Sequence, residues 1–84
     1  MWTVKTTELF DAWFDVQDDA TQEKVLAGLL ALAQGGPSVG RPLVDTIKGS
    51  RFTNLKELRV QHQGEPLRAF FAFDSLRQAI VLCA

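Results

Sequence analysis

The last thirty residues of the chain constrain its fold most, because they hold three short apolar segments separated by turn-forming residues. The segments are Leu55–Gln61, Leu67–Phe73 and Gln78–Cys83. The residues between them, His62–Pro66 and Asp74–Arg77, include the glycine, proline and aspartate that favour turns. Short segments rich in aromatic and branched residues between such turns are typical of β-strands. The pattern predicts two consecutive β-hairpins and an antiparallel sheet.

The first hairpin has a sequence that also predicts its register. Gln63-Gly64 can form a two-residue turn with glycine in second place, which is a favoured hairpin connection. This turn places Leu58 opposite Ala69 and Arg59 opposite Arg68. The two arginines would then face each other on one side of the sheet.

The second hairpin is expected to turn at Ser75-Leu76, which places Phe71 opposite Ile80. With these registers, one face of the sheet is wholly apolar and comprises Leu58, Val60, Ala69, Phe71, Phe73, Ile80 and Leu82. The other face comprises Glu57, Arg59, Gln61, Arg68, Phe70, Ala72 and Val81. A wholly apolar face must be covered, and helices from the first half of the chain are the expected cover.

The first half predicts one strand and two helices. Trp2–Thr6 alternates and favours a strand, after which Thr6 or Thr7 can cap a short helix with an apolar stripe of Leu9, Phe10, Trp13 and Phe14. A second helix follows Asp18 and Asp19 and ends at Gly35-Gly36-Pro37, since proline cannot continue a helix. Its inner side is expected to carry Val25, Leu26, Leu29, Leu30 and Leu32. The result is an α+β fold of order β-α-α-β-β-β, a single domain over residues 1–84 with a helical hairpin packed on one face of the antiparallel sheet.

Composition indicates the cellular compartment in which the protein is expected. No apolar run is long enough to cross a bilayer, no signal peptide is visible, and Cys83 is the one cysteine, so we expect a cytoplasmic protein without a disulfide or a membrane segment. The net charge of −1 conceals an asymmetry, because residues 1–34 carry −4 and residues 35–84 carry +3. Two oppositely charged halves are consistent with two different partners or with two solvated surfaces.

The basic half holds the candidate binding residues. Directly opposed arginines repel by up to about 1 kcal/mol, so the pair of Arg59 and Arg68 gives the fold no benefit unless an anion lies between them. The long connection at residues 37–54, in which only Leu43–Ile47 looks extended, adds further cations, namely Arg41, Lys48 and Arg51. The cluster therefore indicates a phosphate-backbone site, and ordinary solvent-exposed charge is the alternative. His62 lies beside a turn and is expected to be an exposed spectator.

These residues together resemble a known family, the HigB-like, phage-associated branch of the RelE/ParE toxin superfamily. The resemblance runs along nearly the whole chain and rests on an ordered series of motifs. They are Trp2-x-Val4, Phe10-x-x-Trp13-Phe14, Gly40-Arg41-Pro42, Lys48-Gly49-Ser50-Arg51, Asn54-Leu55-Lys56-Glu57-Leu58-Arg59, Leu67-Arg68 and Phe71-Ala72-Phe73-Asp74.

The resemblance implies the toxin of a type II toxin–antitoxin system, an endoribonuclease that cuts messenger RNA on the ribosome without a metal or other cofactor. It implies that the ribose 2′-hydroxyl attacks the adjacent phosphate while Arg59 and Arg68 stabilise the developing charge. Lys56 or Glu57 would handle the hydroxyl proton, and Arg41, Lys48 and Arg51 would contact flanking RNA. The implied partners are a cognate antitoxin, expected to be a helix-turn-helix protein, and the ribosome with its messenger RNA.

One departure from the branch leaves alternatives open. Toxins of this branch usually continue past the last strand into a C-terminal helix, whereas this sequence stops at Ala84. The chain is therefore expected to lack that helix, as a truncated form would. A degenerate toxin that binds its antitoxin without cutting, or a ParE-like topoisomerase inhibitor, are the alternatives to the nuclease.

Overall fold

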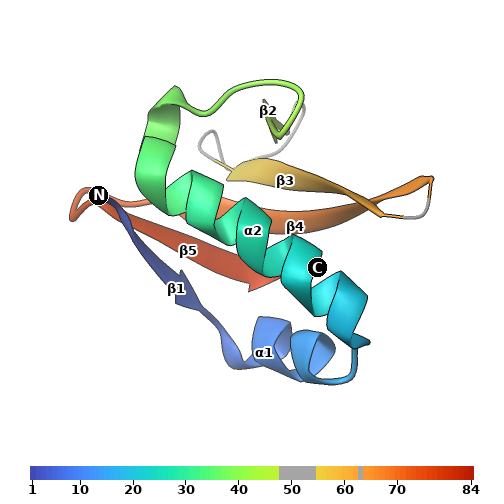
Figure 1. Cartoon of the computed structure of the whole chain (residues 1–84). Helices are drawn as coiled ribbons and strands as arrows, with labels where there is room; N and C mark the ends of the chain where they lie inside the picture. Colours follow the sequence, from blue (N-terminus) through green and yellow to red (C-terminus); the bar gives the residue numbers. More distant parts are fainter. Residues whose placement is uncertain (48–54, 63) are drawn as a thin grey trace.

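The computed structural model describes residues 1–47, 55–62 and 64–84 of the chain. Its elements are β1 (Thr3–Thr6), α1 (Glu8–Asp15), α2 (Asp19–Gly35), a 3-10 turn (Gly36–Ser38), β2 (Val44–Thr46), β3 (Leu55–His62), β4 (Glu65–Phe73) and β5 (Gln78–Cys83). The five strands form one sheet of order β1-β5-β4-β3-β2, in which β1 runs parallel to β5 and the other neighbours are antiparallel (Figure 1). The predicted α+β fold is confirmed, and the segment that looked briefly extended adds the edge strand β2.

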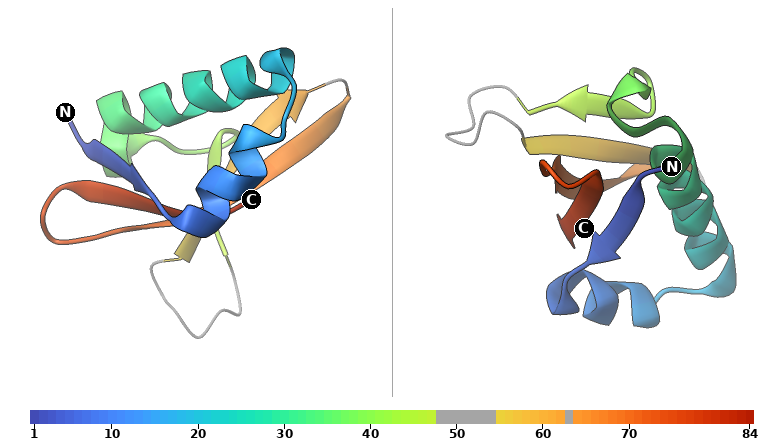
Figure 2. Two further views of the ribbon diagram at one scale, coloured as in Figure 1. Left: turned by 90° about the horizontal axis from the view of Figure 1, so that it is seen from below. Right: turned by 90° about the vertical axis from the view of Figure 1, so that its left-hand side faces the viewer.

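Helix α2 lies across one face of the sheet, and α1 lies beside the end of β5 (Figure 2). Between the helices and the sheet lies a buried apolar core, made of Phe10, Val25, Leu32, Val44, Leu58, Val60, Ala69, Phe71, Ala79 and Val81. Within the described residues, no helix covers the opposite face of the sheet, which we call the open face. No described helix is both long enough and apolar enough to span a membrane.

The predicted helix ends are confirmed by their capping contacts. The Thr7 hydroxyl accepts a hydrogen bond from the Phe10 amide at 3.2 Å, and the Asp18 carboxylate accepts one from the Thr21 amide at 2.8 Å. At the other end of α2, Gly36 adopts a φ of 55°, where a residue with a side chain would be strained.

The expected inner face of α2 is partly wrong. Val25 and Leu32 are buried as predicted, but Leu26 is 53% exposed and Leu30 is 55% exposed. The face of α2 that meets the sheet is centred instead on Gly28, which is buried. A Cβ atom at Gly28 would lie 3.1 Å from Val60 Cγ2, so the glycine allows α2 to approach β3 closely.

The register of the first hairpin is confirmed. Leu58 pairs with Ala69 and Arg59 pairs with Arg68, so the two arginines lie opposite each other across β3 and β4. Leu58 is fully buried and Ala69 is 6% exposed on the helix-covered side. Strict alternation along β3 then places Arg59, with Glu57 two residues earlier, on the open face.

The register of the second hairpin is wrong by one residue. The chain turns through a three-residue loop, because Asp74 N–H donates to Gln78 O and Arg77 takes the left-handed conformation with φ of 58°. Phe71 consequently pairs with Val81 instead of Ile80, and an irregularity lies between Phe70 and Phe71.

This shift exchanges the two faces of β5. Ala79 and Val81 are fully buried in the core, although Val81 was expected on the face that carries Arg59 and Arg68. Ile80, expected in the core, pairs with Ala72 on the open face, and Leu82 is 38% exposed.

The close approach of α2 to β3 generates a stability prediction. Replacing Gly28→Leu forces a large side chain against Val60 and Leu58, which overpacks the core and should destabilise the protein by roughly 1–3 kcal/mol. The matched control is Ala27→Leu on the exposed side of the same helix, which should change stability by a few tenths of a kcal/mol. Urea unfolding measures both, and equal stability of the two variants would contradict the packing described.

Candidate functional site

The candidate site is the part of the open face where β2, β3 and β4 lie side by side. Glu57 pairs with Phe70 in β4 and with Asp45 in β2, and Arg59 pairs with Arg68. These residues share one face because each is two positions along its strand from the next, or directly across from it. The pairing of neighbouring strands therefore places two carboxylates and two arginines together.

Arg59 does not extend freely toward Arg68. Its Nε donates to Glu57 Oε1 at 2.7 Å, and its Nη2 lies 2.7 Å from the same oxygen and 3.5 Å from Asp45 Oδ2. Glu57 is only 6% exposed, so its charge depends on this short contact for compensation. The guanidinium of Arg59 is thus held on the β2 side of the strand.

Arg41 joins the same group of charges. Its Nε donates to Asp45 Oδ1 at 3.1 Å, although its side chain is mostly exposed. The hydrogen bond from Arg41 and that from the Thr46 amide lower the pKa of Asp45, and the charge of Arg59 lowers it further. Arg41, Asp45, Glu57 and Arg59, here named the charge network, contain two cations and two anions and so balance internally.

Arg68 is not part of the charge network. It is exposed on β4, and among the described residues no carboxylate forms an ion pair with it. Its opposite neighbour Arg59 is already neutralised by Glu57 and Asp45. Of the described cations on the open face, Arg68 is therefore the one best placed to receive an external anion.

The other residues predicted for the site are placed as follows. Lys56 alternates to the face of the sheet opposite to Glu57 and Arg59, and its Nζ donates to Thr46 Oγ1 at 3.1 Å. The structure therefore does not bring Lys56 together with the arginine pair. Lys48 and Arg51 lie outside the described residues.

Sequence reasoning missed Asp45. Its role depends on β2 pairing with β3, which sets Asp45 directly opposite Glu57. The only signal in the sequence was the brief extended character of residues 43–47, which does not reveal a strand partner. The carboxylate became relevant only once the pairing placed it beside Arg59.

His62 is not the exposed spectator that its position beside a turn suggested. It is half-buried at the end of β3, and its Nε2 lies 3.0 Å from Thr21 Oγ1 in the first turn of α2. Its Nδ1 is buried and has no hydrogen-bond partner among the residues that the structure describes. His62 therefore connects the start of α2 to the sheet.

The chemistry available at this face is the binding of an anion by a guanidinium group. Arg68 offers several N–H donors in a planar arrangement that suits a phosphate. Among the described residues, no three histidine, cysteine, aspartate or glutamate side chains are grouped as metal ligands would be. The fold and the site together define a small α+β protein with an exposed arginine on an open sheet face.

Comparison with known proteins identifies the family. The family described as "Phage derived protein Gp49-like" matches residues 12–84, and the chain belongs to it. The chain is 48% identical over 84 residues to a Mycobacterium tuberculosis protein named "Putative toxin HigB2", and 40% identical over 72 residues to one named "Putative toxin HigB3" from the same organism. The resemblance seen in the motifs is thus confirmed.

The alignments cover most of this chain and much less of these relatives. They span 99% of the chain and 41% of HigB2, and 86% of the chain and 61% of HigB3. The fold also matches a chain in the crystal structure of the intact Escherichia coli RelBE toxin–antitoxin complex, with a TM-score of 0.72. That match covers 99% of this chain and 93% of the other at 7% identity, so it supports the fold alone.

The buried contact between Arg59 and Glu57 predicts different effects for the two arginines. Replacing Arg59→Ala leaves Glu57 without its ion pair and should destabilise the protein by about 1–3 kcal/mol. Larger losses apply to fully buried pairs, whereas the Arg59 side chain is 37% exposed. The matched control, Arg68→Ala, should leave stability unchanged or slightly higher, because it removes only repulsion with Arg59. Urea unfolding would refute the assignment if the two variants lost stability equally.

The lowered pKa of Asp45 predicts a dependence of stability on pH. Because the folded-state pKa lies below the ordinary value of 3.8, ionised Asp45 stabilises the fold above that value, and the contribution disappears as pH falls through and below it. Replacing Asp45→Asn should therefore lower stability at pH 6 and have a smaller effect at pH 3. Asp15→Asn, on the exposed side of α1, serves as the control in urea unfolding at both values. A loss for Asp45→Asn that is larger at pH 3 would overturn the prediction.

Proposed function

We propose that this protein is the toxin of a type II toxin–antitoxin system and that it cleaves messenger RNA on the ribosome. Family membership and the names of its relatives support the toxin role. The observation that carries the nuclease assignment is the exposed Arg68, opposite Arg59 on a sheet face that no described helix covers. A face of this kind is accessible to a phosphate backbone.

The proposed reaction needs little from the protein beyond position and charge. The 2′-oxygen of a ribose attacks the adjacent phosphorus, and the bond from phosphorus to the 5′-oxygen of the next nucleotide breaks. The products are a 2′,3′-cyclic phosphate and a 5′-hydroxyl, so the 2′-hydroxyl proton leaves and the 5′-oxygen gains one. Arg68 contacts the phosphoryl oxygens and stabilises the negative charge that grows on them.

The charge network gives Arg59 and Glu57 different roles. Glu57 is buried and bound to Arg59, so we assign it to positioning the arginine rather than to removing the 2′-hydroxyl proton. Arg59 then adds a second positive group beside the phosphate bound by Arg68. Lys56 lies on the other face of the sheet from Arg59, so we do not assign it to removing the 2′-hydroxyl proton. It remains a candidate for contact with flanking RNA, together with Arg41, Lys48 and Arg51.

The partners proposed for this activity are a cognate antitoxin, the ribosome and its messenger RNA, all in the cytoplasm. The antitoxin is supported by the fold match to a chain of a toxin–antitoxin complex and by the relatives' names. We expect the antitoxin to be a helix-turn-helix protein, and the candidate antitoxin to test is the product of the gene adjacent to that of this chain.

The test is growth and RNA cleavage after expression of this protein without antitoxin. We expect growth arrest and cut messenger RNA on ribosomes, and we expect Arg68→Ala to reduce the cleavage rate by about a hundred- to a thousand-fold, since it removes a donor that stabilises transition-state charge. The matched control is Arg77→Asn, at the far hairpin loop, where asparagine tolerates the left-handed backbone. This control should cleave RNA as the unchanged protein does.

Three outcomes would contradict parts of this proposal. If Arg68→Ala remains as toxic as the unchanged protein, the phosphate role of Arg68 is wrong. If growth stops while messenger RNA stays intact and DNA supercoiling changes, topoisomerase inhibition replaces RNA cleavage as the function. If the unchanged protein is not toxic but binds the candidate antitoxin, the degenerate form is the correct description.

A further inference from the structure

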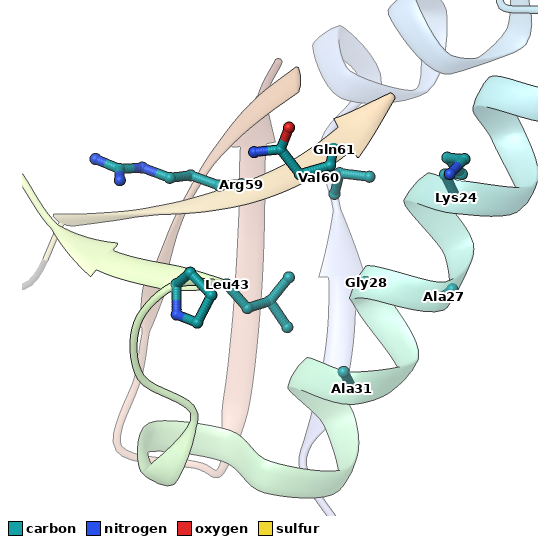
Figure 3. A pocket seen from close by; sticks show the side chains of 9 residues that line it. Lys24, Ala27, Gly28, Ala31, Leu43, Arg59, Val60 and Gln61 are labelled. Atoms are coloured by element: carbon teal, nitrogen blue, oxygen red, sulfur yellow. The ribbon is translucent and has the colours of Figure 1, made fainter. Parts of the chain in front are cut away.

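A groove of about 390 Å³ runs between α2 and the part of β3 that extends past β2 (Figure 3). It is lined by Lys24, Ala27, Gly28, Ala31, Pro42, Leu43, Arg59, Val60 and Gln61. Its walls are mainly small or apolar. Figure 3 shows the guanidinium of Arg59 directed away from the groove.

The strand that forms one wall of the groove has an unpaired edge there. β2 pairs with Lys56–Leu58, and one further hydrogen bond joins the Arg59 amide to Leu43 O at 2.7 Å. Pro42 has no N–H and cannot extend the ladder. Among the described residues, β3 therefore has β4 as its sole strand neighbour beyond this point.

The backbone of Gln61 points out of this edge. The amide of Arg59 faces β2, and backbone groups two residues apart along a strand face the same way. Gln61 thus presents its N–H and C=O toward the groove side, away from β4. Its partner in β4 is Pro66, which has no N–H to offer a ladder hydrogen bond.

The charged residues that line the groove are all basic. Lys24 is exposed at one end, and none of the lining residues is acidic. The neighbouring surface of α2 is also apolar, since Val25–Ala33 contains no polar side chain and Leu26 and Leu30 are exposed. The groove thus combines backbone hydrogen-bonding groups, an apolar floor and one free ammonium group.

We infer that an extended segment of the antitoxin adds as a further strand to the free edge of β3 and lies in this groove. Backbone groups of the segment bond to Gln61, an apolar side chain lies against Ala27 and Ala31, and a carboxylate lies beside Lys24. The inference rests on the proposed function for the identity of the partner. An extended segment fits better than a packed helix, because a helix has no free backbone groups to offer to Gln61.

The experiment measures binding of the candidate antitoxin to the whole chain by calorimetry. Replacing Ala27→Arg fills the groove with a charged side chain and should weaken binding by about tenfold or more. Ala20→Arg, exposed in the first turn of the same helix, is the matched control and should bind as the unchanged chain does. Lys24→Glu should weaken binding and reduce its dependence on salt, while Lys5→Glu on the distant strand β1 should not.

A second pair of variants tests the strand pairing itself. Gln61→Pro removes a backbone N–H that points away from β4 and should weaken binding by about three- to tenfold. Gln61→Ala keeps the N–H and should bind nearly as the unchanged chain does. Thermal unfolding of each free variant tests whether the fold is retained.

The outcomes separate this inference from the proposed function. Undiminished binding by Ala27→Arg overturns the groove while leaving the toxin role intact. A failure of the unchanged chain to bind the candidate antitoxin overturns the partner and the toxin–antitoxin assignment together. If the free chain is a dimer that Ala27→Arg converts to a monomer, the groove is occupied by a second copy and the inference is wrong.

Discussion

Helix α2 rests on the sheet through Gly28, and the positions of Glu57, Arg59 and Arg68 follow from that contact. Because the backbone of α2 lies so close to Leu58 and Val60, the face beneath it excludes everything except compact apolar groups. Alternation along the strands then sends Glu57, Arg59 and Arg68 to the opposite face. The packing that stabilises the fold therefore also places the candidate site.

Charge on the open face is distributed unevenly, and the distribution supports different proposed roles for the two arginines. Arg59 and Arg68 are equivalent in the strand ladder but differ in their surroundings, since β2 brings Asp45 to Arg59 and no described strand brings a carboxylate to Arg68. A guanidinium with a buried carboxylate partner must exchange that contact to bind an anion, whereas an exposed one need not. The pair is thus better described as one anchored and one available cation than as a symmetric clamp.

The sequence was sufficient where local rules act alone, and insufficient where they compete. In the first hairpin, the register predicted from the Gln63-Gly64 pattern gave the arginine pair correctly. In the second hairpin, Ser75-Leu76 looks like a two-residue turn, but Arg77 takes up the left-handed conformation and lengthens the loop by one residue. That single residue determines whether Val81 or Ile80 enters the core. Likewise, the unbroken apolar run in α2 could not show which leucines face the sheet, and Asp45 had no recognisable role until β2 was paired.

The groove and the open face are two sides of the same strand, and Arg59 belongs to both. Arg59 is one of the residues that line the groove, and its guanidinium lies in the charge network. A segment bound along the free edge of β3 would therefore contact Arg59 without covering Arg68. Neutralisation by such a segment would then act by fixing Arg59 and excluding RNA from the strand edge, rather than by occupying the phosphate position itself. An antitoxin that binds in this way should hold the arginine pair in place while the phosphate position beside Arg68 stays open to a small anion.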